Sequence, residues 1–396
     1  MSRLLIPLLL LFSAVPRANA DSDLFRSCLE AIGRQAVDTG LDPGRVETLL
    51  GQLEPQPRVL ELDRAQPEFR QTFAGYMRTR VNERRIWQGR LMLAQHAELL
   101  LRLQREFGVP GRYLVAFWGM ETNYGSFLGR MPTLDSLATL ACDERRSEFF
   151  TAELIQALTL AEREGLGSDQ MRGSWAGAMG HTQFMPSAYL AHAIDGDGDG
   201  RVDLWNSIED ALSSAANFLA ELGWRPGARW GREVRLPEGF DYRLAAENGW
   251  RPLREWARLG IRNIDDGALP IADFEASLRV PMGHSGPAFL IYPNFEVILR
   301  WNRSENYAIA VGHLADRIVG GPSISHLPAE DRLPSGTALL AMQRALAERG
   351  FDPGELDGVL GPATRAALRE FQSAADLVAD GYPDPETLTA LAVSTD

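Results

Sequence analysis

The carboxyl group of Glu121 lies in a sequence context that suits acid–base catalysis. It ends an apolar run and directly precedes a polar turn that finishes in glycine, within residues 116–125 (AFWGMETNYG). Apolar neighbours such as Trp118 would desolvate this carboxyl group. Desolvation raises the pKa of a carboxyl group, so that it can stay protonated near neutral pH. Such a group can act as the general acid that breaks a glycosidic bond. The same residues also fit an ordinary helix end, with Gly125 ending the helix and Glu121 exposed to solvent. Other segments of the chain are needed to choose between a catalytic and an ordinary glutamate.

A second constellation, DGDGDGRVDLWNSIED, favours a bound cation. Three aspartates stand at positions 1, 3 and 5 of an EF-hand-like loop: Asp195, Asp197 and Asp199. Gly200 fills position 6, where the loop turns sharply, and the carbonyl of Arg201 is available at position 7. Position 12 is Asn206 rather than glutamate, so the distal carboxylate must come from elsewhere, and Glu209 or Asp210 could supply it as the following helix begins. We expect a structural Ca²⁺ here, the alternative being a flexible acidic loop.

Two further segments have the residue types of a carbohydrate site. Residues 174–186 (SWAGAMGHTQFMP) alternate small and apolar residues, so backbone can approach a ligand closely, and Gln183 could orient a sugar hydroxyl or amide. Residues 292–307 (YPNFEVILRWNRSENY) read as a strand-like FEVIL followed by an aromatic and amide-rich turn, with Ser304 or Asn306 capping a helix. Tight helix packing would explain the first segment equally well. No second carboxylate in these segments looks like a nucleophile, which indicates a mechanism with one acid that uses the substrate's own groups.

Helices must position most of these residues. The periodicity predicts one long amphipathic helix over 86–107, a break at 108–111, and a buried helix over 112–121 that carries Glu121. Further helices are expected over 147–164, 208–222 and 307–319. Residues 223–283 are rich in Gly, Pro, Trp and Arg and predict an irregular insertion with some β structure, including a strand over 233–236.

The chain of 396 residues is long enough for two or three domains. Residues 321–336 have the composition of a linker, and 337–396 predict a separate unit with short helices over 337–349, 362–375 and 385–392. The net charge of −13 and the lack of a basic run argue against a nucleic-acid partner.

The first twenty residues predict a secretory signal peptide. Arg3 precedes an apolar run over 4–15, and residues 18–20 form an A-x-A site, so we expect cleavage after Ala20. The run is too short to span a bilayer, no cysteine follows the site to carry a lipid anchor, and we expect an exported, periplasmic protein without a transmembrane segment. In an oxidising compartment Cys28 and Cys142 can form a disulfide, although two buried thiols remain the alternative.

The order of GMETNYG, AGAMGHTQFMP, DGDGDGRVDLW and NFEVILRWNRSENYA across residues 23–318 resembles the membrane-bound lytic transglycosylase B family of bacterial peptidoglycan-cleaving enzymes. This sequence looks like a soluble member. The resemblance implies a mainly α fold, with a lysozyme-like helical core, an N-terminal helical part and the β-containing insertion, in a catalytic domain over 21–320.

The resemblance also implies a reaction and its residues. Glu121 would be the single acid/base that cleaves the β-1,4 bond between N-acetylmuramic acid (MurNAc) and N-acetylglucosamine (GlcNAc) without water, leaving 1,6-anhydroMurNAc ends. Substrate-binding residues of the family correspond to Tyr76, Ser174, Gln183, Asn302 and Tyr307. The Ca²⁺ ligands correspond to Asp195, Asp197, Asp199, the carbonyl of Arg201, and Asp210. Phe218 and Trp301 depart from the tyrosines that are common at these positions, which alters hydrogen bonding but leaves Glu121 in place.

The last sixty residues resemble a three-helix peptidoglycan-binding domain through LLAMQRALAERGF, ELDGVLGPATRAALREFQ and DGYPDPETLTAL. Peptidoglycan glycan strands are therefore the expected partner, and no organic cofactor is expected. Protein partners, such as cell-wall synthesis proteins, cannot be read from the sequence. A hydrolytic muramidase and a non-catalytic cell-wall scaffold are the alternatives to a lytic transglycosylase.

Overall fold

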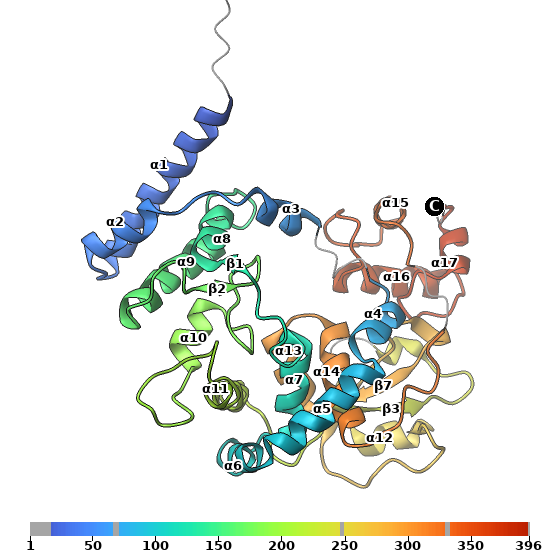
Figure 1. Ribbon diagram of the computed structural model, residues 1–396. Coiled ribbons are helices and arrows are strands. Elements are labelled where there is room, and N and C mark those ends of the chain that lie inside the picture. Colours follow the sequence, from blue (N-terminus) through green and yellow to red (C-terminus); the bar gives the residue numbers. More distant parts are fainter. Residues whose placement is uncertain (1–16, 66–70, 246–248, 329–332, 395–396) are drawn as a thin grey trace, which may run out of the picture. The chain divides into compact units, whose positions relative to one another are not determined.

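A computed structural model describes residues 17–65, 71–245, 249–328 and 333–394 (Figure 1). The chain divides into two compact units. The first unit comprises residues 1–64, 129–179 and 184–190, and the second comprises 65–128, 180–183 and 191–396. Most of the predicted signal peptide, residues 1–16, lies outside the described residues. None of the described helices combines the length and apolarity that a bilayer crossing needs.

The first unit is built from helices with one small ribbon. Its helices are α1 (Arg17–Asp38), α2 (Pro43–Gly51), α3 (Pro57–Ala65), α8 (Thr133–Ala141), α9 (Ser147–Arg163) and the start of α10 (Pro186–His192). The short strands β1 (Met131–Pro132) and β2 (Arg172–Gly173) pair antiparallel, with Met131 opposite Gly173. Helices α8 and α9 pack on each other, and α2 begins where the side chain of Asp42 accepts a hydrogen bond from the Arg45 amide.

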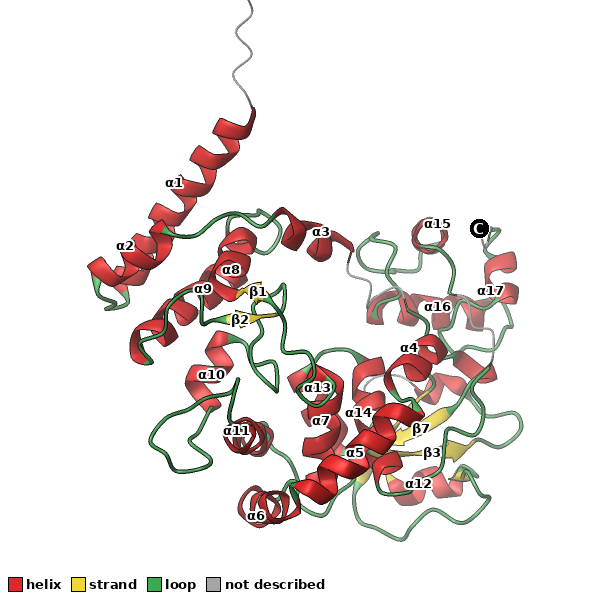
Figure 2. Cartoon of the chain, viewed as in Figure 1, coloured by secondary structure: helices red, strands yellow, loops and turns green. Residues whose placement is uncertain are grey.

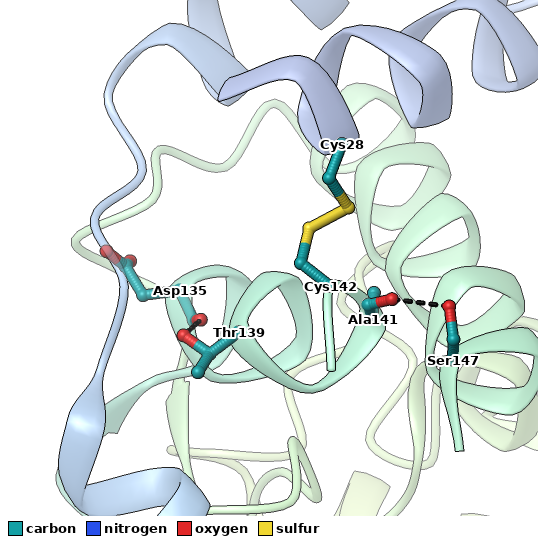
Figure 3. Close-up of a disulfide and its surroundings, with 6 residues drawn as sticks. All are labelled: Cys28, Asp135, Thr139, Ala141, Cys142 and Ser147. Atoms are coloured by element: carbon teal, nitrogen blue, oxygen red, sulfur yellow. Dashed lines mark hydrogen bonds between the residues drawn. A yellow bond between two sulfur atoms is a disulfide. The ribbon is translucent and has the colours of Figure 1, made fainter. Parts of the chain in front are cut away.

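A disulfide between Cys28 and Cys142 joins α1 to the end of α8 (Figure 3). Their Cα atoms lie 5.9 Å apart although the residues are 114 positions apart in the sequence. This pairing confirms the disulfide prediction over the buried-thiol alternative. In the same unit, the buried carboxylate of Asp63 on α3 forms ion pairs with Arg145, at 2.9 Å, and with Arg146, which both follow α8.

Helices also dominate the second unit. They are α4 (Phe73–Arg80), α5 (Glu83–Gln95), α6 (Ala97–Phe107), α7 (Gly111–Thr122), α11 (Ile208–Glu221), α13 (Pro293–Trp301) and α14 (Glu305–Ile318). Helix α7 is apolar along most of its length and is largely buried, as its sequence predicts, and it packs against α5, α6, α11 and α14. Side chains of Phe117, Leu314 and their neighbours form one continuous apolar core around it.

The predicted insertion forms an antiparallel sheet (Figure 2). Its strand order is β4-β6-β7-β3-β5, from β3 (Gly231–Arg235), β4 (Arg251–Pro252), β5 (Arg262–Asn263), β6 (Glu275–Arg279) and β7 (Ala288–Ile291). The register places Glu233 opposite Phe289 and Leu278 opposite Leu290. Helix α12 (Leu253–Arg258) and the 3₁₀ turns η2 (Tyr242–Ala245) and η3 (Gly283–Ser285) complete this part, whose own apolar cluster surrounds Trp256.

Three helices follow near the C-terminus, α15 (Gly336–Glu348), α16 (Pro362–Ala374) and α17 (Pro385–Ala390), as predicted. They enclose a small core of their own around Met342, Leu346 and Leu368. Two buried amides organise the connecting turns, because Gln343 donates to Asp357 and Thr364, and Gln372 donates to Asp380 and Thr387. Of the linker predicted over 321–336, residues 329–332 lie outside the described residues.

Two of the predicted elements are wrong. The single helix over 86–107 is two helices, because His96 leaves helical geometry (φ −106°, ψ 25°) and serves as the C-cap of α5 and the N-cap of α6. The strand-like FEVIL lies inside α13, which Pro293 begins at its first turn. A short apolar run fits a buried strand and a buried helix equally well, so the pattern could not separate them.

Candidate active site and calcium loop

Glu121 lies in the last turn of α7, where the chain leaves the apolar core. Its side chain is partly exposed, whereas Met120 and Thr122 on either side are buried. The helix ends because Asn123 (φ 50°) and Tyr124 (φ 60°) adopt left-handed backbone conformations. The helix stop is therefore Asn123 rather than the predicted Gly125, which follows with a φ of 76°.

Two side chains that lie at least 180 residues further along the chain donate hydrogen bonds to the carboxylate of Glu121. The indole Nε1 of Trp301 donates to Glu121 Oε1 at 3.0 Å, and the hydroxyl of Tyr307 donates to the same oxygen at 2.5 Å. Trp301 ends α13, and Tyr307 lies in the first turn of α14, where its amide donates to the capping hydroxyl of Ser304. The alternative of a solvated, unengaged glutamate is therefore wrong.

Aromatic rings continue away from this carboxylate. The ring of Trp301 lies 4.7 Å from that of Phe117 and 5.2 Å from that of Phe218, measured between centroids. Phe218 in turn stacks on His192 at 4.4 Å with an interplanar angle of 18°. Phe218 and Trp301, the two departures from the family pattern, therefore contact each other, and the indole at 301 supplies a hydrogen bond to the acid.

Gln183 is held in a backbone conformation that residues other than glycine rarely adopt. Its φ is 51°, in the left-handed region, and its side-chain Nε2 donates to the carbonyls of Gly180 and Leu128 at 2.9 and 3.1 Å. Residues in such strained conformations cluster at functional sites, where the surrounding contacts hold them. The side chain reaches the segment that follows the turn after α7.

The remaining predicted substrate residues have distinct surroundings. Asn302 caps the end of α13, and its Oδ1 accepts from the Ser304 amide at 3.1 Å. Tyr76 on α4 is only 3% exposed, and the guanidinium of Arg80 lies 5.5 Å from its ring centroid. Ser174 belongs to the first unit, where its hydroxyl accepts from the Ala178 amide and closes a tight turn.

Carboxylates of the predicted calcium loop converge. One oxygen each from Asp195, Asp197 and Asp210 lies within 4.8 Å of the others. Backbone amides wrap the loop around them: Gly198 and Gly200 donate to Asp195 at 2.6 and 2.8 Å, and these hydrogen bonds lower the pKa of the Asp195 carboxyl. Gly200 has a φ of 87°, as the sharp turn at position 6 requires.

Asp210 is the distal carboxylate that the structure brings to this cluster. It is 1% exposed at the start of α11, and its two oxygens accept from the amides of Gly196 and Asp203 at 2.8 and 2.7 Å. Glu209, the alternative, is exposed. Asp199, also a predicted ligand, is not among the three carboxylates that converge; it is exposed, and its side chain accepts from the Arg201 amide at 2.8 Å. Three carboxylates supply hard oxygen donors of the kind that Ca²⁺ prefers, and they would make up part of the six to eight oxygen ligands that this ion takes.

Sequence reasoning missed the contact between Trp301 and Glu121. The sequence marks Trp301 as a departure from the family's tyrosine with altered hydrogen bonding, but it does not show which atom the indole N–H reaches across 180 positions. A weak signal exists, since Trp301 comes just before a segment rich in hydrogen-bond donors and a capped helix.

A comparison of the chain with known families finds two matches. Residues 24–316 match the transglycosylase SLT domain, and residues 335–391 match the putative peptidoglycan binding domain. This chain belongs to the transglycosylase SLT domain family. The SLT match contains Glu121, its two hydrogen-bond donors and the acidic loop.

Relatives of this SLT protein include characterised enzymes. It is 33% identical over 232 residues to membrane-bound lytic murein transglycosylase B from Escherichia coli strain K12, an alignment that covers 57% of this chain and 61% of that protein. Crystal structures of SltB3 from Pseudomonas aeruginosa are similar with a TM-score of 0.88 and 44% identity, covering 93% of this chain and 99% of theirs. They contain NAG-anhNAM-pentapeptide in one case and NAG-NAM-pentapeptide in the other. The likeness confirms the predicted fold class, mainly helical and lysozyme-like with small sheets and a C-terminal helical domain.

Escherichia coli lytic transglycosylase Slt35 was solved in complex with calcium. That structure is similar with a TM-score of 0.64 and 29% identity, covering 74% of this chain and 92% of that one. The SLT protein described here is thus homologous to lytic transglycosylases, with a calcium-containing enzyme among its structural relatives.

Proposed function

We propose that this protein is a peptidoglycan lytic transglycosylase with Glu121 as its single acid/base. The observation that carries the proposal is the pair of donors, Trp301 and Tyr307, that converge on Glu121 Oε1 at the exposed end of a buried helix. Membership of the SLT family supports the same assignment. The bond cleaved is the β-1,4 linkage from MurNAc to GlcNAc.

The reaction needs a proton donor that later takes a proton back. Glu121 protonates the glycosidic oxygen, the bond from MurNAc C1 to that oxygen breaks, and GlcNAc leaves with a free 4-hydroxyl. The N-acetyl group of MurNAc stabilises the electron-poor C1. The C6 hydroxyl of the same sugar then attacks C1 and returns its proton to Glu121, so the 1,6-anhydro product forms without water and the enzyme is restored.

Trp301 and Tyr307 prepare Glu121 for both halves of this cycle. Because both donate to Oε1, we place the acid proton of Glu121 on Oε2. When Glu121 gives up that proton, the same two donors stabilise the carboxylate that forms, and hydrogen bonds to an ionised acceptor are about twice as strong as those between neutral groups. Donors that are in place before the charge develops need no reorganisation during the reaction.

The amide and hydroxyl side chains near this acid are proposed to hold the sugars. Gln183 and Asn302 have side-chain amide groups, and Tyr307 has its ring beside that of Phe117. Ser174 and Tyr76 are proposed as further substrate contacts on the strength of the family resemblance. In the relative SltB3 the bound molecules carry NAG, NAM and a peptide.

The acidic loop is proposed to hold a structural Ca²⁺ through Asp195, Asp197, Asp199, the Arg201 carbonyl and Asp210. The convergence of three carboxylates within 4.8 Å supports this, because like charges this close repel unless a cation lies among them. The ion would fix the loop in front of α11 and takes no part in the chemistry.

In the proposed domain organisation, the family matches over residues 24–316 and 335–391 support the two folded domains, and the signal peptide and linker rest on the sequence alone. A signal peptide over 1–20 directs export to the periplasm, a catalytic domain spans 21–320, a linker spans 321–336, and a peptidoglycan-binding domain spans 337–396. The binding domain would raise the local concentration of substrate without adding catalytic contacts.

Product analysis of purified sacculi tests the proposal. Mass spectrometry should find 1,6-anhydroMurNAc ends with the wild type and intact glycan with Glu121→Gln, which should still bind sacculi. Reducing MurNAc ends would establish a hydrolytic muramidase instead, and lysis by Glu121→Gln equal to the wild type would remove Glu121 from the mechanism.

A further inference from the structure

The turn that follows Glu121 is strained and needs support from outside its own helix. Asn123, Tyr124 and Gly125 have φ values of 50°, 60° and 76° in succession. Residues other than glycine rarely adopt such conformations, which persist only where neighbouring groups impose them. Whatever imposes them also sets where Glu121 points.

Thr122, the residue next to Glu121, connects this turn to His181. Its buried hydroxyl donates to the His181 carbonyl at 2.8 Å and accepts from the Gly125 amide at 3.0 Å. A Cβ atom at Gly125 would lie 2.4 Å from His181 Cε1, so the imidazole packs directly on the turn.

The imidazole of His181 is oriented by one further hydrogen bond. Trp118 Nε1 donates to His181 Nδ1 at 3.0 Å, and the two rings meet edge to face at 5.6 Å. An acceptor role for Nδ1 places the ring proton on Nε2, and burial lowers the pKa of His181, so the ring is neutral at pH 7. Trp118 lies one helical turn before Glu121, so His181 contacts α7 on both sides of the acid.

The backbone of His181 is tied in turn to the acidic loop. Its amide donates to the Leu204 carbonyl at 2.8 Å, and a Cβ atom at the neighbouring Gly180 would lie 2.5 Å from that same oxygen. Leu204 follows Asp203, whose amide donates to Asp210. The segment 180–183 therefore lies between the acidic loop and the end of α7.

We infer that His181 is a positioning residue, which holds the turn after α7 against the acidic loop and thereby fixes the direction of the Glu121 carboxyl. The inference rests on the proposed function, since it takes Glu121 as the acid. Neither Nδ1 nor the carbonyl of His181 needs to reach the substrate for this role. Its effect appears in the rate of the chemical step rather than in sugar binding.

Substitutions at both ends of the connection test the role. His181→Ala removes the acceptor for Trp118 and should lower kcat about 10- to 100-fold, the loss that a misplaced catalytic group produces, with KM within about twofold of the wild type. His181→Asn keeps an acceptor near the Nδ1 position and should recover most of kcat. Thr122→Val is the second variant, for the case in which His181→Ala does not fold. It is nearly isosteric, removes the hydroxyl contacts with His181 and Gly125, and should lower kcat by a similar factor.

His96 offers a matched control on the other side of the same indole. Its ring also meets Trp118 edge to face at 5.6 Å, but the Trp118 N–H goes to His181. His96→Ala therefore removes an equal ring contact, and should lower the melting temperature while leaving kcat within about twofold.

Comparable kcat losses for His96→Ala and His181→Ala, or no recovery in His181→Asn, would overturn the positioning role, as would a Thr122→Val enzyme with the wild-type kcat. Failure of the proposed function itself is seen separately, because it appears in the wild-type products and in Glu121→Gln without any change at His181.

Discussion

The hydroxyl of Tyr307 donates a 2.5 Å hydrogen bond to Oε1 of Glu121, from a position 186 residues further along the chain. The bond joins the first turn of α14 to the last turn of α7, and these two helices pack along each other in the core of the second unit. The acid is therefore oriented by a residue whose own position depends on the packing of the whole helical core.

Tyr307→Phe should lower kcat by about 10- to 100-fold. A hydrogen bond to a charged group contributes about 1.5–3 kcal/mol, and each 1.4 kcal/mol is a factor of about ten in rate. The ring remains in its contact with Phe117, so the melting temperature should change little. Initial rates on purified sacculi and a thermal melt measure the two effects.

Tyr113→Phe is the control for that experiment. Tyr113 is a buried tyrosine like Tyr307, but it lies on α7, at the opposite end of that helix from Glu121. Its hydroxyl accepts from the Trp230 amide. This variant should lose stability because the amide is left without its acceptor, and it should keep its rate. A rate loss equal to that of Tyr307→Phe would show that any lost hydroxyl has this effect.

The buried helix and its acid could be predicted because both depend on local sequence. An almost unbroken apolar run fixes α7, and the polar turn after it places one carboxylate at the edge of the core. The break at His96 could not be predicted, because no glycine or proline marks it and the apolar period of α5 continues into α6. The partners of Glu121 were equally hidden, since a contact across 180 residues depends on tertiary packing that one sequence does not display.

The acidic loop likewise combines a feature that local sequence predicts with one that depends on tertiary structure. The spacing of Asp195, Asp197 and Asp199 with Gly200 predicts a turning loop from local geometry alone, and the structure has the loop with its glycine at φ 87°. The choice between Glu209 and Asp210 needed the start of α11, because only one face of that first turn points toward the other carboxylates.

Reduction of the disulfide should destabilise the first unit. The Cys28–Cys142 bond closes a loop of 114 residues, and loss of a cross-link of this length typically lowers the free energy of unfolding by about 2–4 kcal/mol. A thermal melt with dithiothreitol should therefore show a lower transition than one without it. The double variant Cys28→Ser, Cys142→Ser should melt at the lower temperature in both buffers; a reductant effect that persists in this variant would have another source.

Chelation of calcium should lower the melting temperature of the wild type. Removing the ion leaves the carboxylates of Asp195, Asp197 and Asp210 close together and uncompensated. Asp210→Asn should melt at a reduced temperature and respond little to EDTA, because the buried carboxylate is missing. Glu209→Gln, at the exposed neighbour, should keep the full response to EDTA. Equal responses from the two variants would rule out Asp210 as the distal ligand.

Acidification should destabilise the protein through His313 on α14. Burial lowers the pKa of His313 from its ordinary 6.5 to about 4, because the charged imidazolium loses solvation, with Asp316 offsetting part of the effect. The folded pKa is the lower one, so the unfolded chain binds a proton first as the pH falls. Above pH 6.5 the titration of His313 therefore does not change the free energy of unfolding. Between pH 6.5 and 4 it lowers this free energy by up to about 3 kcal/mol.

Melting curves across this range measure the contribution of His313. His313→Gln cannot take up the proton, so its melting temperature should fall less steeply than that of the wild type between pH 6.5 and 4. A residual slope should remain, because burial also lowers the pKa values of His96 and His181. His326→Gln, at an exposed position, should follow the wild-type curve. If His313→Gln followed it as well, the acid sensitivity would have to come from other groups.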